Sequence, residues 1–221
     1  MIDAPHPELF DLTSLQQQAE LAATVGGRGT SSIVHFPDRS WVLRHYRRGG
    51  LVGKVLNDQY FGFQPEKSRS WSEWRLLGTL FTEGFPVPRP IAASVTFHSG
   101  YYQADIITEY IPETKTLAQL LVDTDLDLAV WAELGQCIGR FHKRGVDHAD
   151  LNAHNILVDC SGAVYLLDFD RGCFRPAGQW QKRNLLRLRR SLLKVAGINN
   201  RFHFHEKGWS SLLNGYGRSE E

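Results

Sequence analysis

Residues 146–170 decide the fold of this chain; they read Val-Asp-His-Ala-Asp-Leu-Asn-Ala-His-Asn-Ile-Leu-Val-Asp-Cys-Ser-Gly-Ala-Val-Tyr-Leu-Leu-Asp-Phe-Asp. The apolar run at 156–158 predicts a short strand, and the Asp-Cys-Ser-Gly sequence at 159–162 is typical of a turn. A second apolar run at 164–167 predicts another strand. Two such strands joined by a short turn form a β-hairpin. The sequence therefore predicts a rigid hairpin with polar residues at both of its ends.

Three of these polar residues have the spacing of a kinase catalytic site. Asp150 and Asn155 fit D-x-x-x-x-N, with His148 two positions before the Asp, and Asp168 stands where kinases have the Asp of D-F-G. Phosphoryl transfer needs a carboxylate near the attacking hydroxyl and Mg²⁺ on the phosphates. We therefore predict that Asp150 accepts or orients the hydroxyl proton and that Asn155 and Asp168 bind Mg²⁺ through oxygen.

Ordinary turns are the alternative for each residue alone, because Asp and Asn favour turns. All three together favour a kinase-like site. We expect His148 to orient the loop through hydrogen bonds rather than to transfer a proton.

Composition sets limits on the class of protein. A chain of 221 residues can bury a full core, and its net charge of +1 indicates no particular partner. The cysteines, Cys137, Cys160 and Cys173, are far apart, which favours a reducing cytoplasm over a zinc site. The N-terminus lacks the pattern of a signal peptide, and no apolar run is long enough to span a bilayer.

The first half of the chain has the pattern of a kinase N-lobe. Apolar residues at spacings of three and four predict a helix over 68–81, with Trp71, Trp74, Leu77 and Phe81 on it. The prolines of 86–90 stop this helix. Predicted strands lie on either side of it, at 33–36, 41–46, 91–97 and 102–109.

Several residues of this half are candidates for contact with a nucleotide. The backbone of a glycine turn could approach phosphate oxygens. Arg44 stands where kinases have a lysine, and Glu73 stands where kinases have the glutamate that pairs with that lysine. Residues 109–113 are a candidate hinge. The candidates are Gly27, Gly29, Thr30, Arg44, Glu73, Glu109 and Ile111. A plain hairpin, a solvated edge-strand Arg and a surface Glu remain the alternatives.

The second half begins with a predicted short helix over 116–121, and a predicted long helix over 126–144 follows and ends at Gly145. After Asp170 the chain has no A-P-E sequence and no acidic residue until after His205, and it is rich in Arg. This segment fits a core-packed helix with a solvated cationic side, or a surface that attracts anionic lipid or a polyanionic acceptor. The candidate acceptor-binding residues are Arg171, Arg183, Arg187 and Arg190.

Four stretches together resemble the 3-deoxy-D-manno-octulosonic acid (Kdo) kinases, which belong with the lipopolysaccharide core kinases and have a protein-kinase-like fold. They are Gly27-Arg28-Gly29-Thr30, the string from Val42 to Leu51, Pro86-Val87-Pro88-Arg89-Pro90, and His148-Ala149-Asp150-Leu151-Asn152-Ala153-His154-Asn155. The resemblance covers about residues 24–195. This chain departs from the general kinase pattern at Arg44, where kinases have a lysine.

The resemblance implies a single α+β domain over 1–221: a small antiparallel-sheet N-lobe with one main helix (about 1–110), a hinge (about 109–113) and a reduced, mainly helical C-lobe (about 114–221). It implies an enzyme of Gram-negative bacteria that uses ATP and Mg²⁺ to phosphorylate the 4-hydroxyl of Kdo on the Kdo-lipid A precursor. The implied location is peripheral, at the cytoplasmic face of the inner membrane, in contact with an anionic membrane surface. No nucleic acid and no obligate protein partner are expected.

Other functions compete with this interpretation. A kinase acting on a core heptose would use the same catalytic residues. A pseudokinase could bind nucleotide or glycolipid without transfer, and Arg44 favours this, whereas the intact Asp150, Asn155 and Asp168 oppose it. A protein kinase would need a peptide platform after Asp170, and the sequence offers none.

Overall fold

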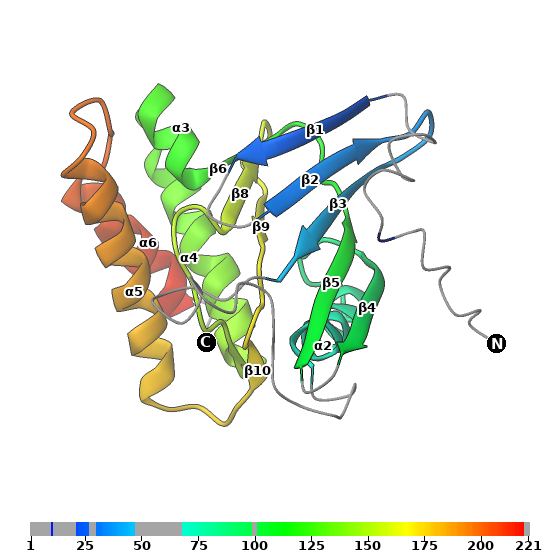
Figure 1. The fold of residues 1–221 in the computed structure, drawn as a ribbon. Coiled ribbons are helices and arrows are strands. Elements are labelled where there is room, and N and C mark those ends of the chain that lie inside the picture. The colour runs from blue at the N-terminus through cyan, green and yellow to red at the C-terminus, as the bar shows by residue number, and fades with distance from the viewer. Residues whose placement is uncertain (1–9, 11–20, 27–29, 47–67, 99–100, 219–221) are drawn as a thin grey trace. The chain divides into compact units, whose positions relative to one another are not determined.

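The computed structural model describes residue 10 and residues 21–26, 30–46, 68–98 and 101–218. The chain divides into two compact units (Figure 1). The first comprises Met1–Thr82 and Pro88–Ile111, and the second comprises Glu83–Val87 and Pro112–Glu221. The short segment Glu83–Val87 therefore packs with the second unit although the first unit surrounds it in sequence.

The first unit contains an antiparallel sheet of five strands in the order β1-β2-β3-β5-β4. The strands are β1 (Leu21–Gly26), β2 (Thr30–His35), β3 (Ser40–His45), β4 (Pro90–His98) and β5 (Tyr101–Glu109). Alternation along the strands places Val34, Leu43, Ala92 and Ile107 in one buried apolar cluster. The strands predicted from the sequence are confirmed, and β1 adds one that the sequence did not predict.

Helix α2 (Arg69–Thr82) packs on β4 and β5, as Figure 1 shows. The predicted helix is confirmed, but its predicted apolar face is partly wrong. The buried residues are Ser70, Glu73, Leu76, Leu77 and Leu80, while Phe81 is 45% exposed. Trp71 and Trp74, the two tryptophans of this helix, are half-buried. A buried glutamate on the inner face is a sign of a specific partner.

The second unit is mainly helical. Its elements are β6 (Thr114–Thr116), α3 (Leu117–Asp123), α4 (Leu128–Lys143), β7 (Val146–Asp147), β8 (Ile156–Asp159), β9 (Val164–Leu166), β10 (Cys173–Phe174), α5 (Gln179–Ala196) and α6 (Glu206–Arg218). Helices α4 and α6 pack against each other (Figure 1). A small sheet has the order β6-β8-β9, and β10 pairs with β7. The α+β class is confirmed.

The predicted hairpin is confirmed as β8 and β9, which pair antiparallel. Its turn is closed by Asp159, whose Oδ1 accepts hydrogen bonds from the backbone N–H groups of Ser161 (2.8 Å) and Ala163 (2.9 Å). These bonds, with one from the Ser161 hydroxyl, hold the pKa of Asp159 below its ordinary value. Gly162 has φ 87°, a conformation that glycine adopts without strain. The turn chemistry thus fixes the register of the hairpin.

Gly145 ends the long helix, as predicted, in a left-handed conformation (φ 84°). The backbone of Arg175 passes so close that a Cβ on Gly145 would lie 2.7 Å from its carbonyl oxygen. The Arg175 N–H donates to the Gly145 carbonyl at 2.7 Å. Glycine satisfies both the left-handed conformation and this close approach, and β7 then leads from it into the segment that contains Asp150.

Candidate active site

The candidate catalytic loop, residues 148–155, is held by two helices of the second unit. The Ala118 N–H at the start of α3 donates to the Ala153 carbonyl at 3.0 Å. The Ala153 N–H in turn donates to the Ser191 hydroxyl of α5 at 3.2 Å. Helix α3 begins at this point because Thr116 and Gln119 form a capping box. The loop backbone is therefore fixed on both sides of one buried alanine.

Asp150 presents a half-exposed carboxylate at the start of this loop. Its Oδ1 accepts from Arg187 Nη1 at 3.1 Å, and its Oδ2 accepts from Asn152 Nδ2 at 3.2 Å. The side chain is 54% exposed. A carboxylate with one partner on each oxygen keeps further lone pairs for a hydroxyl donor. This geometry suits the role predicted for Asp150.

Asn155 ties the loop to the hairpin. Its side-chain Nδ2 donates to the backbone carbonyl of Asp150 at 3.0 Å, and its backbone carbonyl accepts from the Leu167 N–H at 2.9 Å. The Leu167 bond brings Asn155 to the strand end that carries Asp168. Because the amide nitrogen bonds within the loop, the amide oxygen is the atom left to act as a ligand.

Asp168 follows β9 in the left-handed region, with φ 59°. Among non-glycine residues, Asp is one of the few that adopt this conformation readily. The next residue, Phe169, is completely buried, with its ring centroid 5.7 Å from Phe141 and 4.6 Å from His148. Burial of this ring fixes the backbone from which the Asp168 carboxylate projects.

An oxygen donor set of this kind fits Mg²⁺. The Asp168 carboxylate and the Asn155 amide oxygen are hard ligands, and Mg²⁺ is bound in proteins by one or two such groups together with water and phosphate oxygens. Within the described part of the chain no group of three His, Cys, Asp or Glu residues could hold a metal ion by itself. The donor types of Asn155 and Asp168 fit a Mg²⁺ ion that also takes water and phosphate oxygens as ligands.

His148 is a buried, neutral histidine whose hydrogen bonds fix its tautomer. Its Nε2 lies 2.8 Å from the Leu167 carbonyl, which can only accept, so Nε2 carries the proton. Its Nδ1 accepts from the Asp150 N–H at 3.3 Å. Burial lowers the pKa of His148 below its ordinary value. His148 thus makes hydrogen bonds of the kind expected for a residue that orients the loop.

A second buried histidine, His142 on α4, predicts a loss of stability in acid. Its Nδ1 lies 2.9 Å from the Tyr216 hydroxyl, and burial lowers the pKa of His142 to about 4. An unfolded histidine titrates at about 6.5, so the unfolded chain binds a proton between those values and the folded chain does not. Stability is expected to fall as the pH decreases from about 6.5 to about 4, and His148 acts in the same direction.

The midpoint of thermal unfolding against pH measures this effect. His142→Gln removes one of the two groups and is expected to flatten the curve across that range. Equal acid sensitivity in both proteins would contradict the assignment to His142.

In the first unit, Arg44 and Glu73 form the ion pair that the sequence predicted. Arg44 Nη2 on β3 donates to Glu73 Oε2 on α2. Glu73 is only 3% exposed. A third residue joins them: Tyr46 donates its hydroxyl hydrogen to Glu73 and accepts from Arg44 Nη2 at 3.0 Å. Sequence reasoning missed Tyr46, although it stands two positions after Arg44 and therefore on the same side of the chain.

Tyr46→Phe is expected to destabilise the first unit by roughly 1–3 kcal/mol, because a buried carboxylate loses one of its donors. Burial raises the pKa of Tyr46 far above its ordinary value, so the phenol stays protonated and remains a donor throughout the accessible pH range. Urea denaturation measures the change. Tyr110→Phe is the matched control, since the Tyr110 hydroxyl makes no hydrogen bond to any described residue. An equal effect of the two substitutions would contradict this role of Tyr46.

The remaining predicted nucleotide contacts are only partly described. Gly27 and Gly29 lie outside the described residues. Thr30 opens β2, and the structure describes its backbone only. Glu109 ends β5, where its N–H donates to the Arg89 carbonyl at 2.8 Å, and Ile111 is half-buried beyond it. Their roles stay predictions.

Of the predicted acceptor-binding arginines, Arg187 is the one that contacts Asp150. Arg183 and Arg190 are exposed on α5, where Arg190 Nε donates to the Leu186 carbonyl at 3.3 Å. Arg171 is exposed after Asp168, with φ 61°. The buried face of α5 is formed by Trp180, Asn184, Leu188 and Leu192. The helix is thus core-packed on one side and cationic on the other.

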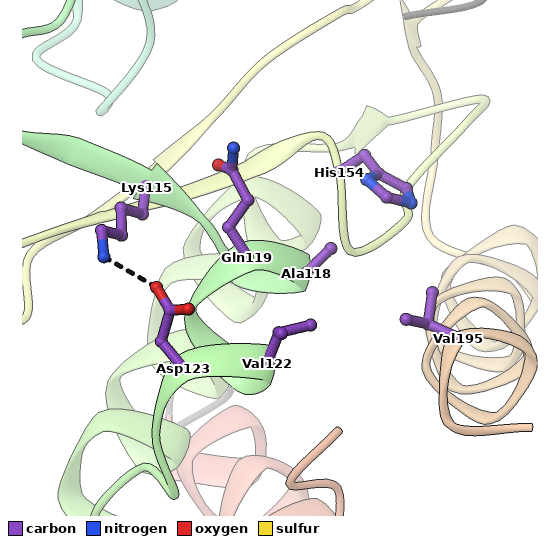
Figure 2. Close-up of a pocket in the computed structure, with 7 residues that line it drawn as sticks. All are labelled: Lys115, Ala118, Gln119, Val122, Asp123, His154 and Val195. Carbon is purple, nitrogen blue, oxygen red and sulfur yellow. Dashed lines mark hydrogen bonds and ion pairs between the residues drawn. The ribbon is translucent and has the colours of Figure 1, made fainter. Parts of the chain in front are cut away.

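A pocket of about 470 Å³ lies beside the loop, as Figure 2 shows. His154 of the loop and Val195 of α5 line it, together with Ala118, Gln119 and Val122 of α3. At one side Lys115 pairs with Asp123 at 2.7 Å. Asp150, Asn155 and Asp168 are absent from its lining, so this pocket is not the place where we expect the chemistry.

Comparison with known proteins gives the family. The model of the lipopolysaccharide kinase (Kdo/WaaP) family matches residues 13–216. A protein of Photobacterium profundum named 3-deoxy-D-manno-octulosonic acid kinase is 43% identical over 208 residues, which are 94% of this chain and 87% of that protein. Proteins with the same name from Vibrio vulnificus and Stenotrophomonas maltophilia are 38% and 45% identical. These alignments cover 97% and 85% of this chain, and 91% and 76% of the two relatives. The resemblance inferred from the four sequence stretches is confirmed, and this chain belongs to the lipopolysaccharide kinase (Kdo/WaaP) family.

Proposed function

We propose that this kinase transfers the γ-phosphoryl group of ATP to the 4-hydroxyl of the Kdo residue on the Kdo-lipid A precursor, in lipopolysaccharide core biosynthesis. The names of its relatives support Kdo as the acceptor sugar. Membership of a kinase family supports ATP as the donor. The single observation that carries the chemistry is the oriented, half-exposed Asp150 carboxylate at the head of the loop.

In the proposed reaction the acceptor hydroxyl oxygen forms a bond to the γ-phosphorus. The bond between this phosphorus and the oxygen that bridges to the β-phosphate breaks, and ADP leaves. The hydroxyl proton passes to the Asp150 carboxylate. Asn152 and Arg187 hold that carboxylate, and the neutral His148 holds the backbone N–H of Asp150.

Mg²⁺ would be held by the Asn155 amide oxygen and the Asp168 carboxylate, and when bound it would neutralise charge on the phosphates. In the first unit, Arg44 is the residue that we propose for contact with nucleotide phosphates. Glu73 and Tyr46 orient its guanidinium, which binds oxyanions with a planar fork of donors rather than with the point charge of a lysine.

We further propose that the exposed side of α5 binds the anionic acceptor at a membrane surface, at the cytoplasmic face of the inner membrane. Arg183 and Arg190 lie on this side, and Leu186 and Leu193 beside them are 46% and 47% exposed. Cations with apolar neighbours suit a phosphorylated glycolipid in an anionic bilayer. No helix in the described ranges combines the length and the apolar character that crossing a membrane requires.

Replacing both Arg183 and Arg190 with Ala is expected to raise the acceptor KM several-fold while kcat changes little, because exposed charges steer an anionic substrate. The difference from the wild type is expected to shrink as salt is added. The matched control replaces Lys143 and Arg218, exposed cations of α4 and α6, with Ala. An unchanged acceptor KM at low salt would contradict this use of α5.

The experiment that tests the proposed function is a mass assay. The purified protein is incubated with ATP, Mg²⁺ and either Kdo-lipid A precursor or a heptosylated acceptor, and NMR locates the phosphate on the product. One phosphate on the Kdo 4-hydroxyl is the expected result. Phosphate only on the heptose would favour a heptose kinase of the lipopolysaccharide core. Binding of ATP without any product would favour a pseudokinase.

A further inference from the structure

We propose that Arg187 of helix α5 is a positioning residue for Asp150 and acts on the rate of phosphoryl transfer rather than on binding of the acceptor. The inference rests on the proposed role of Asp150 as proton acceptor, and it adds the residue that orients this carboxylate. Arg187 is 37 positions away in the sequence. It approaches Asp150 because α5 runs along the loop.

Three polar side chains of α5 contact the segment 147–153 in order. Asn184 Nδ2 donates to Asp147 Oδ1 at 3.1 Å, Arg187 Nη1 donates to Asp150 Oδ1 at 3.1 Å, and the Ser191 hydroxyl accepts from the Ala153 N–H at 3.2 Å. Residues at i, i+3 and i+7 lie on one side of a helix. A single side of α5 therefore sets the position of the loop at three points spaced three residues apart.

The loop contains no cation of its own that could hold Asp150. Residues 148–155 include two histidines and no Lys or Arg. His148 is buried and neutral and bonds to the backbone of Asp150, not to its carboxylate. Within the described residues, the carboxylate has Arg187 on Oδ1 and Asn152 on Oδ2. Two donors on different oxygens fix the rotation of the carboxylate plane, which a reacting hydroxyl must meet in one orientation.

The exposure of this pair indicates that its contribution is to geometry rather than to folding. The side chains of Arg187 and Asp150 are 48% and 54% exposed. Exposed ion pairs add little to stability because water and salt screen them. Loss of Arg187 is therefore expected to change the thermal midpoint little, whereas misplacement of a reacting group lowers kcat strongly.

The test compares Arg187→Ala with Lys143→Ala, which removes an exposed cation of α4, away from the side of α5 that we propose for the acceptor. Arg187→Ala is expected to lower kcat by roughly tenfold to a hundredfold, with the KM values for ATP and acceptor nearly unchanged. Added guanidinium ion at low concentration is expected to restore part of the lost kcat, and to leave the activity of Lys143→Ala unaffected.

A double-mutant cycle separates positioning of Asp150 from other roles. In the Asp150→Asn background, Arg187→Ala is expected to cause little further loss in single-turnover rate, because residues that act as a unit are not additive. A loss as large as in the wild-type background would overturn the proposal. So would a raised acceptor KM with unchanged kcat, which would make Arg187 an acceptor contact.

The cycle is run with whichever acceptor the wild-type protein phosphorylates. Phosphate on the heptosylated acceptor alone would refute the proposed function, and the cycle would still decide the role of Arg187.

Discussion

Asp150→Asn is expected to lower the kcat of phosphoryl transfer by roughly 10²–10⁴-fold, the usual contribution of a positioned acid or base. The amide has the shape of the carboxylate but cannot accept the proton of the acceptor hydroxyl. It can still interact with Asn152 through its oxygen, so the loop is expected to keep its conformation. The measurement is the rate of appearance of phosphorylated acceptor under single-turnover conditions.

Two comparisons make this result specific to Asp150. Asp127→Asn is the matched control, because Asp127 is exposed at the start of α4 and its side chain makes no capping hydrogen bond. The thermal stabilisation that ATP with Mg²⁺ gives the protein distinguishes a variant of the proposed base from a variant of the proposed metal ligand. Asp150→Asn is expected to keep this stabilisation, and Asp168→Asn is expected to lose most of it. Full activity in Asp150→Asn would show that the reaction does not need the Asp150 carboxylate.

Gly135→Ala is expected to destabilise the second unit by about 3 kcal/mol or more, since overpacking against fixed atoms has large costs. Gly135 lies on the buried side of α4. A Cβ there would lie 1.9 Å from the Leu212 carbonyl oxygen and 2.7 Å from the Tyr216 nitrogen. Both are backbone atoms of α6, so no side-chain rotation can relieve the clash. The two helices would have to separate.

Gly217→Ala, on α6 itself, is the matched control. A Cβ at Gly217 would meet no atom within 4 Å. In an open helical position Ala is better than Gly by up to about 1 kcal/mol, so this variant is expected to be as stable as the wild type or more so. Thermal and urea unfolding followed by circular dichroism measure both variants. Similar midpoints for the two proteins would show that α4 and α6 do not need this close approach.

The sequence by itself predicted which candidate site residues lie near one another, because their positions depend on spacing within short segments. Asp150 and Asn155 are five residues apart in one loop, and the turn at Asp159 brings Asn155 and Asp168 to the same end of a hairpin. Local hydrogen bonding fixes all of these positions. Arg44 and Glu73 were paired correctly through the general kinase pattern, although they belong to different elements.

The sequence did not predict α6, because the glycines of this helix weaken the helical pattern. Gly208 and Gly215 have low helix propensity, yet they are buried, and a Cβ on either would clash with α4. A Cβ on Gly208 would lie 2.6 Å from the Trp131 ring, and one on Gly215 would lie 2.0 Å from the Ala132 carbonyl oxygen. These glycines serve tertiary packing, which a window of sequence does not contain.

Only the tertiary structure showed which cation contacts the Asp150 carboxylate. Arg183, Arg187 and Arg190 lie on one stretch of basic sequence, and nothing in its local pattern distinguishes them. Packing of Trp180, Leu188 and Leu192 fixes the rotation of α5. That rotation turns Arg187 toward Asp150 and leaves Arg183 and Arg190 exposed. The sequence thus determined which residues are candidates for the chemistry, because they lie close together along the chain. Packing determined which distant residue contacts Asp150, because the contacts on the buried side of α5 set the rotation of this helix about its axis.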